Sequence, residues 1–466
     1  MIKEKRRIIS LLILICLMFI GLIVYLSHFQ IFRAEDMKKH SYNKRLWINE
    51  ENILRGSIID RNGNILAYSQ EQGDNINRYY NYSNLYSHII GYSYREYGKA
   101  GLESAYNNEL LNLRELSGIE EIINIVAPDI EGNNLLLTID HNMQEKTREL
   151  LNGRKGSVVT MNPVTGEIYS MYSYPDFNSS KLREEWINIT EATDSPLMNR
   201  ATQGNYTPGS IFKLVTATAL LESNIDFDYN CTGSTLIDGR TISDSSKTPH
   251  GQIGLEEAII HSCNTYFAEK SVEIGDNKLR EVAQKFMFDE RIPFDLDTNA
   301  SSFSKGNLSK TAIAEAGIGQ GEVLSTPLNM ALVASTIAND GKMVKPYLVK
   351  NIEDFEGKLI RQTRTETLSN VMSPAMANQL ADMMAGVVEI GTGRNASIGN
   401  VPVAGKTGTA ENTPRPSHAW FVGFAPADNP RIAVAVILEE SGTFGGQTAA
   451  PIARDLMIYG LNNINF

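Results

Sequence analysis

Residues 156–172 read GSVVTMNPVTGEIYSMY. Two β-rich runs, 156–161 and 167–172, flank a five-residue turn at 162–166 that contains Asn, Pro and Gly. Short β-rich runs separated by such a turn are typical of a β-hairpin. We therefore expect a hairpin here, and it marks the start of a well-packed domain.

The remaining strands of this domain are predicted near the other end of the chain. Residues 420–424 and 432–438 are apolar and β-rich, and residues 449–461 show the period of a helix. Between the hairpin and these strands the pattern is mainly helical, to about residue 340. Strands at both ends of a segment with helices between them predict one α+β domain whose sheet joins its two ends.

The N-terminus has the pattern of a membrane anchor. Residues 8–26 are apolar, and four basic residues lie between positions 3 and 7. Nineteen residues at about 1.5 Å each nearly span a hydrocarbon core of about 30 Å. The basic residues predict a cytoplasmic N-terminus and an exported remainder. The alternative is a cleaved signal peptide, but residues 25–30 contain no small-x-small cleavage site.

Composition excludes several classes of protein. The 466 residues are 42% hydrophobic and carry a net charge of -11, which argues against disorder and against nucleic-acid binding. Three cysteines argue against a disulfide framework and a multi-cysteine zinc site, and no metal site is predicted. Cys231 and Cys263 either pair or stay as two partly buried thiols, and we favour the unpaired thiols.

The first chemical motif is Ser210-Ile211-Phe212-Lys213, which follows a Thr-Pro-Gly turn. We expect Ser210 at the start of an amphipathic helix that runs to Leu221, with Lys213 one turn away on the same face. A lysine kept neutral by burial can activate a serine hydroxyl. Alone the motif is weak, because a helix cap followed by a solvated lysine gives the same pattern.

The second motif is Ser262-Cys263-Asn264. Residues two apart cannot share a helix face, so the hydroxyl of Ser262 and the amide of Asn264 can converge only on a loop or bend. The hydroxyl can relay a proton and the amide can hold a peptide backbone. An ordinary polar turn would look the same, and the adjacent His261 is interpreted as structural.

The third motif is Lys406-Thr407-Gly408-Thr409, on a predicted strand. Its lysine and threonines suit a carboxylate, and Gly408 lets another backbone or a substrate approach. A strand end that enters a turn is the alternative. Together and in this order, the three motifs form the serine acyl-enzyme set of penicillin-binding proteins and class A β-lactamases.

The sequence resembles a class B penicillin-binding protein, a monofunctional peptidoglycan D,D-transpeptidase. Further stretches carry the resemblance along nearly the whole chain: 55–63, 101–103, 137–144, 199–201, 319–321, 326–328 and 391–393. The resemblance implies a penicillin-binding transpeptidase domain with an antiparallel sheet, helices on both faces and an all-helical subdomain. An elongated β-rich pedestal and one transmembrane helix precede it.

The implied domains are a cytoplasmic tail at 1–7, an anchor at 8–26, an extracytoplasmic pedestal at 27–150 and a transpeptidase domain at 151–466. About 120 exported residues before the last domain are too few for a glycosyltransferase domain. Many relatives carry a second cysteine soon after the position of Cys231, and this chain does not.

By resemblance, Ser210 attacks the penultimate D-Ala carbonyl of a stem peptide, D-Ala leaves, and an amine from a neighbouring strand resolves the acyl-enzyme. Lys213 is the implied general base, Ser262 the proton relay and Asn264 the residue that binds substrate and steadies Lys213. Lys406, Thr407, Gly408 and Thr409 hold the terminal carboxylate. The backbone amides of Ser210 and Thr409 form the oxyanion hole.

The resemblance implies covalent inhibition by β-lactams, no metal or organic cofactor, and a membrane-embedded glycan polymerase as partner. Two other functions use the same residues or fold: a β-lactamase or β-lactam sensor, and a non-catalytic scaffold for division or elongation proteins. We identify no residue to activate a deacylating water, and a scaffold needs neither Ser210 nor Lys213. Arg55 and Asp60 are predicted to support folding or docking, unless they are simply solvated loop charges.

Overall fold

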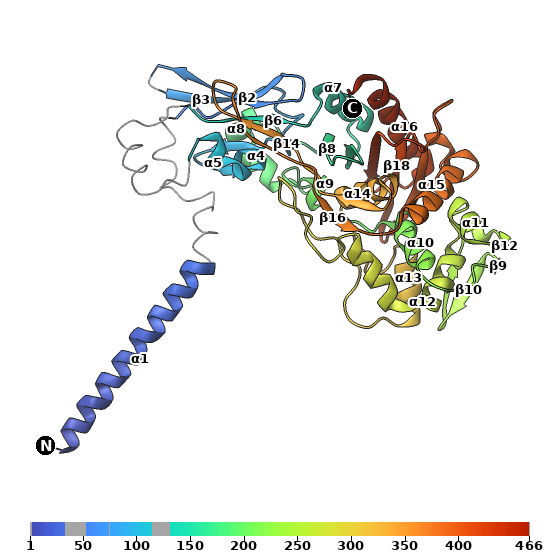
Figure 1. The fold of residues 1–466 in the computed structure, drawn as a ribbon, viewed down its shortest axis with the longest axis horizontal. Coiled ribbons are helices and arrows are strands. Elements are labelled where there is room, and N and C mark those ends of the chain that lie inside the picture. The colour runs from blue at the N-terminus through green and yellow to red at the C-terminus, as the bar shows by residue number, and fades with distance from the viewer. Residues whose placement is uncertain (1, 33–52, 74, 114–130, 466) are drawn as a thin grey trace.

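The computed structural model describes the chain except residues 1, 33–52, 74, 114–130 and 466 (Figure 1). Parts of the predicted pedestal therefore lie outside the described residues. The first helix, α1 (Ile2–Phe32), contains a segment, Ile9–Phe29, that is long and apolar enough to cross a membrane. It covers the predicted span, apart from its first residue, and extends three residues beyond it.

The pedestal is built on a six-stranded sheet. Its strands stand in the order β15 (Leu359–Gln362), β14 (Val349–Glu353), β6 (Asn134–Leu137), β1 (Ile58–Ile59), β2 (Ile65–Gln72) and β3 (Asn75–Tyr80). Only the β1–β6 pair is parallel. A small hairpin and two short helices accompany the sheet: β4 (Tyr92–Tyr94), β5 (Gly98–Ala100), α4 (Gly101–Ala105) and α5 (Asn107–Leu110).

Two strands of the pedestal sheet come from the far part of the chain. β14 pairs with β6 in an antiparallel register in which Ile352 lies opposite Leu135, and β15 extends the edge. The predicted domain boundary at residue 150 remains a prediction. The sheet shows, however, that residues 349–362, placed by sequence in the second domain, pair with the first (Figure 1).

A buried ion cluster holds the pedestal together. Glu103 on α4 is fully buried and binds both Arg55 and Arg78, the latter with 2.7 Å between Nε and Oε1. Asp60 is also buried and accepts hydrogen bonds from the backbone N–H groups of Asn62 and Asn64. The interpretation of Arg55 and Asp60 as solvated loop charges is therefore wrong.

The second sheet has five antiparallel strands in the order β17 (Ala404–Asn412), β18 (Arg415–Ala425), β19 (Ile432–Leu438), β7 (Gly156–Met161) and β8 (Ile168–Tyr174). The predicted hairpin is β7–β8, and the two predicted C-terminal strands are β18 and β19. β19 pairs with both β18 and β7, so the two ends of the domain meet in one sheet as expected.

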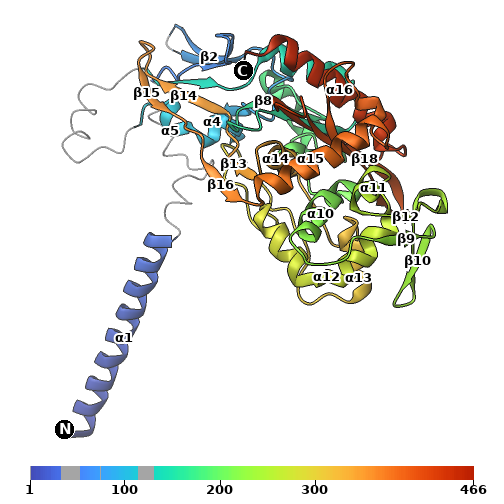
Figure 2. The same cartoon turned by 45° about the vertical axis from the view of Figure 1, so that its right-hand side comes forward.

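Helices cover both faces of this sheet because its central strands are buried on both sides. α14 (Pro327–Ala338) packs against β7, β18 and β19, while α16 (Gly445–Asn463) and α7 (His141–Leu151) lie on the other face (Figures 1 and 2). α15 (Pro374–Glu389) packs along β17. Thr326 caps α14 and Pro327 opens it, which gives the Thr-Pro pair a local structural reason.

A helical subdomain lies beside this core. It contains α10 (Lys213–Leu221), α11 (Leu255–Ile260), α12 (Asn264–Lys285) and α13 (Lys310–Gly317). It is not all-helical, because two antiparallel strand pairs lie on its outer side: β9 (Tyr229–Cys231) with β12 (Gly251–Ile253), and the hairpin of β10 (Ser234–Ile237) and β11 (Arg240–Ser243) (Figure 2). The prediction of an amphipathic helix also fails for α10, since eight of its nine residues are buried.

The remaining elements are short connections. They are α8 (Leu182–Glu191), α9 (Arg200–Gln203), the β13 (Lys342–Val344) and β16 (Thr367–Asn370) pair, and the single-turn 3-10 helices η1 (Ser179–Lys181), η2 (Gly209–Phe212), η3 (Ser245–Lys247) and η4 (Arg394–Ala396).

Candidate active site

The structure brings the three sequence motifs together. The Lys213 Nζ lies 2.7 Å from the backbone oxygen of Ser262 and 2.6 Å from Asn264 Oδ1. The Lys406 Nζ lies 2.9 Å from Ser262 Oγ. Residues from η2 and α10, from the α11–α12 junction and from β17 therefore share one site.

Two glycines let the Ser210 turn lie directly against β17. Gly209 has a φ of +57°, and a Cβ there would come within 2.9 Å of the Thr409 backbone oxygen. A Cβ on Gly408 would come within 2.9 Å of the Pro208 backbone oxygen. The segment that packs closely against Gly408 is thus the backbone just before Ser210. This contact places Ser210 next to Thr409.

Ser262 adopts an unusual backbone conformation between two helices. Its φ of +57° lies in the left-handed region, which costs a non-glycine residue about 1–2 kcal/mol. The bend after α11 places Ser262 Oγ between two ammonium groups, 2.9 Å from Lys406 and 3.3 Å from Lys213. This is the convergence that the two-residue spacing required, with Asn264 as the first residue of α12.

The two lysines are fully buried, and no described carboxylate forms an ion pair with either of them. Burial lowers the pKa of Lys213 to about 8, against smaller opposing effects from Cys263 and Asp244. Burial also lowers the pKa of Lys406 well below its usual value, and the positive charge of Lys213 adds to this. A lysine with such a pKa is partly neutral near physiological pH and can accept a proton.

Among the described residues, the half-buried Ser210 hydroxyl makes no hydrogen bond, and the Lys213 ammonium is directed at Ser262 and Asn264. Hydrogen bonds of a catalytic group are often long before substrate binds and shorten only in the complex. Lys213 is nevertheless one helical turn from Ser210, at the start of α10.

β17 offers its backbone and hydroxyl groups at the edge of the sheet. It is the terminal strand, so its outer edge is not used by another strand of the sheet. Thr407 Oγ1 lies 2.7 Å from Thr392 Oγ1, and Thr409 Oγ1 accepts from the Gly445 backbone N–H at 3.4 Å. An open edge beside the Ser210 turn suits an extended peptide, which adds to a sheet through backbone hydrogen bonds.

Two supporting residues, Asp244 and Glu439, escaped the sequence analysis. Asp244 accepts hydrogen bonds from the backbone N–H groups of Asn264 and Thr265, so it fixes the start of α12. Burial alone would raise the pKa of Asp244, but hydrogen bonds from Cys231, Thr265 and this backbone lower it. No local pattern marks Asp244, because it lies 20 residues before Asn264.

Glu439 is the other one, and its partner is Arg200 of the stretch 199–201. Arg200 is 1% exposed and pairs with Glu439 at 2.7 Å, and Tyr206 donates to the same carboxylate at 2.5 Å. This pair ties α9 to the residue that follows β19. The Asn-Arg-Ala stretch quoted for the resemblance is thus a structural contact between distant segments.

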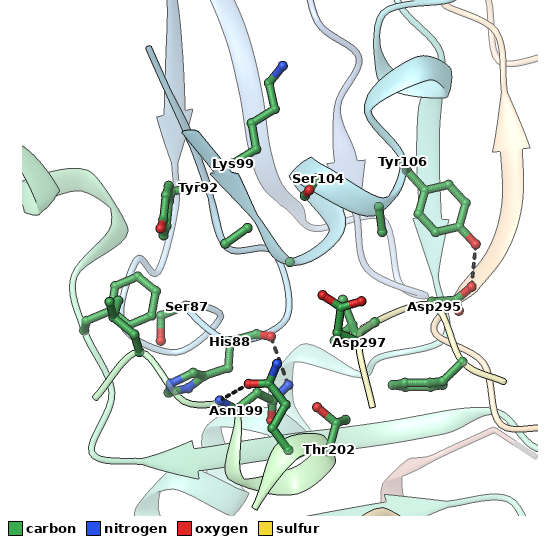
Figure 3. Close-up of a pocket in the computed structure, with 18 of the residues that line it drawn as sticks. Ser87, His88, Tyr92, Lys99, Ser104, Tyr106, Asn199, Thr202, Asp295 and Asp297 are labelled. Carbon is green, nitrogen blue, oxygen red and sulfur yellow. Dashed lines mark hydrogen bonds between the residues drawn. The ribbon is translucent and has the colours of Figure 1, made fainter. Parts of the chain in front are cut away.

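A separate cavity of about 610 Å³ lies between the pedestal and the second domain (Figure 3). His88 and Tyr106 line it from the pedestal, and Asn199 and Asp295 line it from the other side. The Tyr106 hydroxyl donates to Asp295 across the junction. None of the three motifs lines this cavity, so it is not the candidate active site.

Comparison with known proteins finds family matches in both the second domain and the pedestal. Residues 156–458 match the family of penicillin binding protein transpeptidase domains, and residues 55–134 match penicillin binding protein A dimerisation domains. The chain is 33% identical to the peptidoglycan D,D-transpeptidase PbpA of Mycolicibacterium smegmatis, over 97% of each chain. It is 31% identical to PbpA of Mycobacterium tuberculosis, over 91% of this chain and 92% of that protein.

Solved structures agree with this similarity. The ceftriaxone acyl-enzyme complex of penicillin-binding protein A from M. tuberculosis matches with a TM-score of 0.83 at 29% identity. The match covers 89% of this chain and all of that one. A penicillin G acyl-enzyme complex of the same protein matches with a TM-score of 0.81.

Proposed function

This chain belongs to the family of penicillin-binding protein transpeptidases, and from that premise we propose that Ser210 is the nucleophile of its D,D-transpeptidase reaction. The enzyme cross-links peptidoglycan stem peptides through a serine acyl-enzyme, and β-lactams acylate the same serine. The observation that carries the residue assignment is that Lys213 is buried one turn after Ser210 and that no carboxylate among the described residues forms an ion pair with it.

In the acylation step the neutral Lys213 amine takes the proton of Ser210 as Oγ attacks the penultimate D-Ala carbonyl. The Oγ–C bond forms, the C–N bond to the last D-Ala breaks, and its nitrogen receives a proton through Ser262. Ser262 suits this relay because its hydroxyl lies between Lys213 and Lys406. An acceptor amine then attacks the ester carbonyl: a new C–N bond forms, the Oγ–C bond breaks, and the proton that the amine loses returns to Ser210 Oγ.

The transition state gains its stabilisation from backbone donors. The N–H groups of Ser210 and Thr409 form the oxyanion hole, a kind of donor pair that often supplies the largest single contribution to catalysis. The close contact of η2 with β17 supports this assignment. Asn264 positions the ammonium of Lys213 and the substrate backbone.

The edge strand β17 binds the substrate. Lys406, Thr407 and Thr409 on β17 hold the terminal carboxylate, while Gly408 keeps the strand against the serine turn. The peptide lies antiparallel or parallel to β17 as an added strand. Loss of the carboxylate from a substrate would therefore weaken binding at this strand.

The chain is anchored by α1, with residues 1–7 in the cytoplasm and the catalytic domain outside. The basic residues before the apolar segment support this orientation. The partner that supplies glycan strands is a membrane-embedded glycan polymerase, which the pedestal and α1 contact. The pedestal supports this role because its folded sheet contains none of the proposed catalytic residues.

The decisive experiment is fluorescent penicillin labelling of Ser210→Ala. We expect complete loss of the covalent adduct with unchanged thermal unfolding. Ser223→Ala, a change two residues beyond the C-terminal end of α10, is the matched control and should label normally. An adduct of full β-lactam mass on Ser210→Ala would contradict the assignment. Rapid turnover of the β-lactam by the wild-type chain would instead identify a β-lactamase.

A further inference from the structure

Thr392 lies beside the strand proposed to bind the substrate carboxylate, in a stretch, 391–393, that has no role in the proposed reaction. It belongs to the loop between α15 and η4. Its Oγ1 lies 2.7 Å from the Oγ1 of Thr407 on β17, and either oxygen can be the donor of this hydrogen bond. Thr407 is buried, whereas Thr392 is exposed. A buried hydroxyl of the carboxylate site therefore has an exposed hydroxyl as its hydrogen-bond partner.

Close backbone packing fixes the position of Thr392. A Cβ on Gly391 would come within 2.4 Å of the Ile260 backbone oxygen, at the end of α11 and two residues before Ser262. A Cβ on Gly446, the second residue of α16, would come within 2.4 Å of the Thr392 backbone oxygen. Only glycine allows backbones to approach so closely. The loop is therefore held between α11, β17 and the start of α16.

Thr409, the other threonine of the proposed carboxylate site, already has a donor of its own. The Gly445 backbone N–H donates to Thr409 Oγ1 at 3.4 Å. A hydroxyl has one hydrogen and two lone pairs, so Thr409 can accept this bond and still donate its hydrogen. The start of α16 thus leaves Thr409 able to donate to a carboxylate oxygen.

Thr407 can do the same only if Thr392 is the donor of their shared hydrogen bond. If Thr407 donated to Thr392, its one hydrogen would be used and its oxygen would present a lone pair to the carboxylate. If Thr392 donates, the Thr407 hydrogen can go to the carboxylate. Two hydrogen bonds in line then strengthen each other, and a bond to a charged acceptor is the stronger kind. A bound carboxylate therefore favours Thr392 as the donor.

We propose that Thr392 is a positioning residue that sets specificity for a terminal carboxylate. Its hydroxyl donates to Thr407 Oγ1 and so directs the Thr407 hydrogen to the substrate. This role depends on the proposed binding of the carboxylate by Thr407 and Thr409. Because Thr392 acts through Thr407, its contribution appears only with ligands that carry the carboxylate.

The test compares acylation by benzylpenicillin, which has a carboxylate, with acylation by its methyl ester, in the full-length chain in detergent. Thr392→Val keeps the shape of the side chain and removes the hydroxyl. We expect its second-order rate constant with benzylpenicillin to fall about five- to tenfold, and its rate constant with the ester to equal that of the wild type. An equal loss with both compounds, or no loss with benzylpenicillin, would overturn the proposal.

The ratio of the two rate constants is measured on one protein sample, so an unfolded fraction cancels from it. Thr392→Ser keeps the hydroxyl and should restore the wild-type ratio. Thr190→Val, a change of an exposed threonine on α8, is the matched control and should also keep that ratio. A Thr392→Ser chain that behaves like Thr392→Val would overturn the assignment to the hydroxyl.

Stopped-flow measurements separate binding from the chemical step. The carboxylate keeps its charge throughout acylation, so the loss in Thr392→Val should lie in the dissociation constant of the first, non-covalent complex. A loss confined to the acylation step would overturn the positioning role. In a Thr407→Val chain, Thr392→Val should cost nothing further, because the partner through which it acts is gone. A full further loss there would also overturn the proposal.

Failure of the carboxylate site itself would give a different result. If the wild-type chain reacted equally fast with benzylpenicillin and its ester, relative to their reactivity with hydroxide, the proposed carboxylate site on β17 would be refuted, and the role of Thr392 with it. If the wild type preferred the carboxylate and Thr392→Val kept that preference in full, only the role of Thr392 would be refuted.

Discussion

The pedestal and the active site both bury charged side chains, but they treat them in opposite ways. In the pedestal, Glu103 lies between the guanidinium groups of Arg55 and Arg78. Burial alone would raise the pKa of Glu103, yet the two arginines outweigh it and lower that pKa. In the active site, Lys213 and Lys406 are equally buried but have no described carboxylate in an ion pair.

This difference distinguishes charged groups that contribute to folding from groups that can take part in proton transfer. A paired buried charge stays ionised and contributes to folding, while an unpaired buried lysine loses its proton readily and can act as a base. Identical burial therefore yields an ion cluster in one region and a proton acceptor in the other. The presence or absence of an opposite charge decides which.

The largest expected effect is that of Lys213→Arg. A guanidinium is never neutral in this pH range, so the variant lacks the proposed base while the charge and much of the side-chain volume remain. We expect the second-order rate constant for penicillin acylation to fall by about 10²–10⁴-fold. Stopped-flow or gel labelling measures it. Acylation close to the wild-type rate would make Lys213 a structural cation like those of the pedestal.

Glu103→Gln tests the paired charges of the pedestal. It leaves Arg55 and Arg78 buried without a counter-charge, so we expect a loss of about 3–5 kcal/mol in unfolding free energy. Chemical denaturation measures it, and the acylation rate of the folded fraction should stay unchanged. Arg55→Lys is the matched control, because it keeps the charge and should cost less. Slower acylation by folded Glu103→Gln would show that the pedestal influences the site.

The smallest expected effect is the pH dependence of acylation. Because the neutral form of Lys213 is the proposed base and burial lowers its pKa to about 8, we expect the acylation rate to rise with pH and level off above about pH 8. Below that value the slope should approach tenfold per pH unit. The pKa of Glu103 is lowered, so Glu103 stays ionised in this range and its ion pairs with Arg55 and Arg78 should contribute equally at each pH. An acylation rate that falls on raising the pH from 6 to 8 would contradict the assignment.

Local patterns predicted the parts of the fold that depend on periodicity and turn chemistry. The β7–β8 hairpin, strands β18 and β19 and helix α16 lie where their residue patterns placed them. The Ser262–Asn264 spacing correctly required a bend, because side chains two apart point in different directions on any helix. The resemblance added the expectation that these segments share one site.

The sequence alone determined which residue types are available and which local conformations they favour. The tertiary structure alone decided that residues 349–362 complete the pedestal sheet, that α10 is buried on every side, and that Asp244 holds Asn264. It also brought Cys231 and His250 to Cys263, and it placed Lys213 where no carboxylate in the described part of the chain forms an ion pair with it. The burial of a side chain and its pairing with an opposite charge depend on residues that lie dozens of positions away. Periodicity along the chain therefore does not encode them. Only the packed fold determines the pKa of such a side chain.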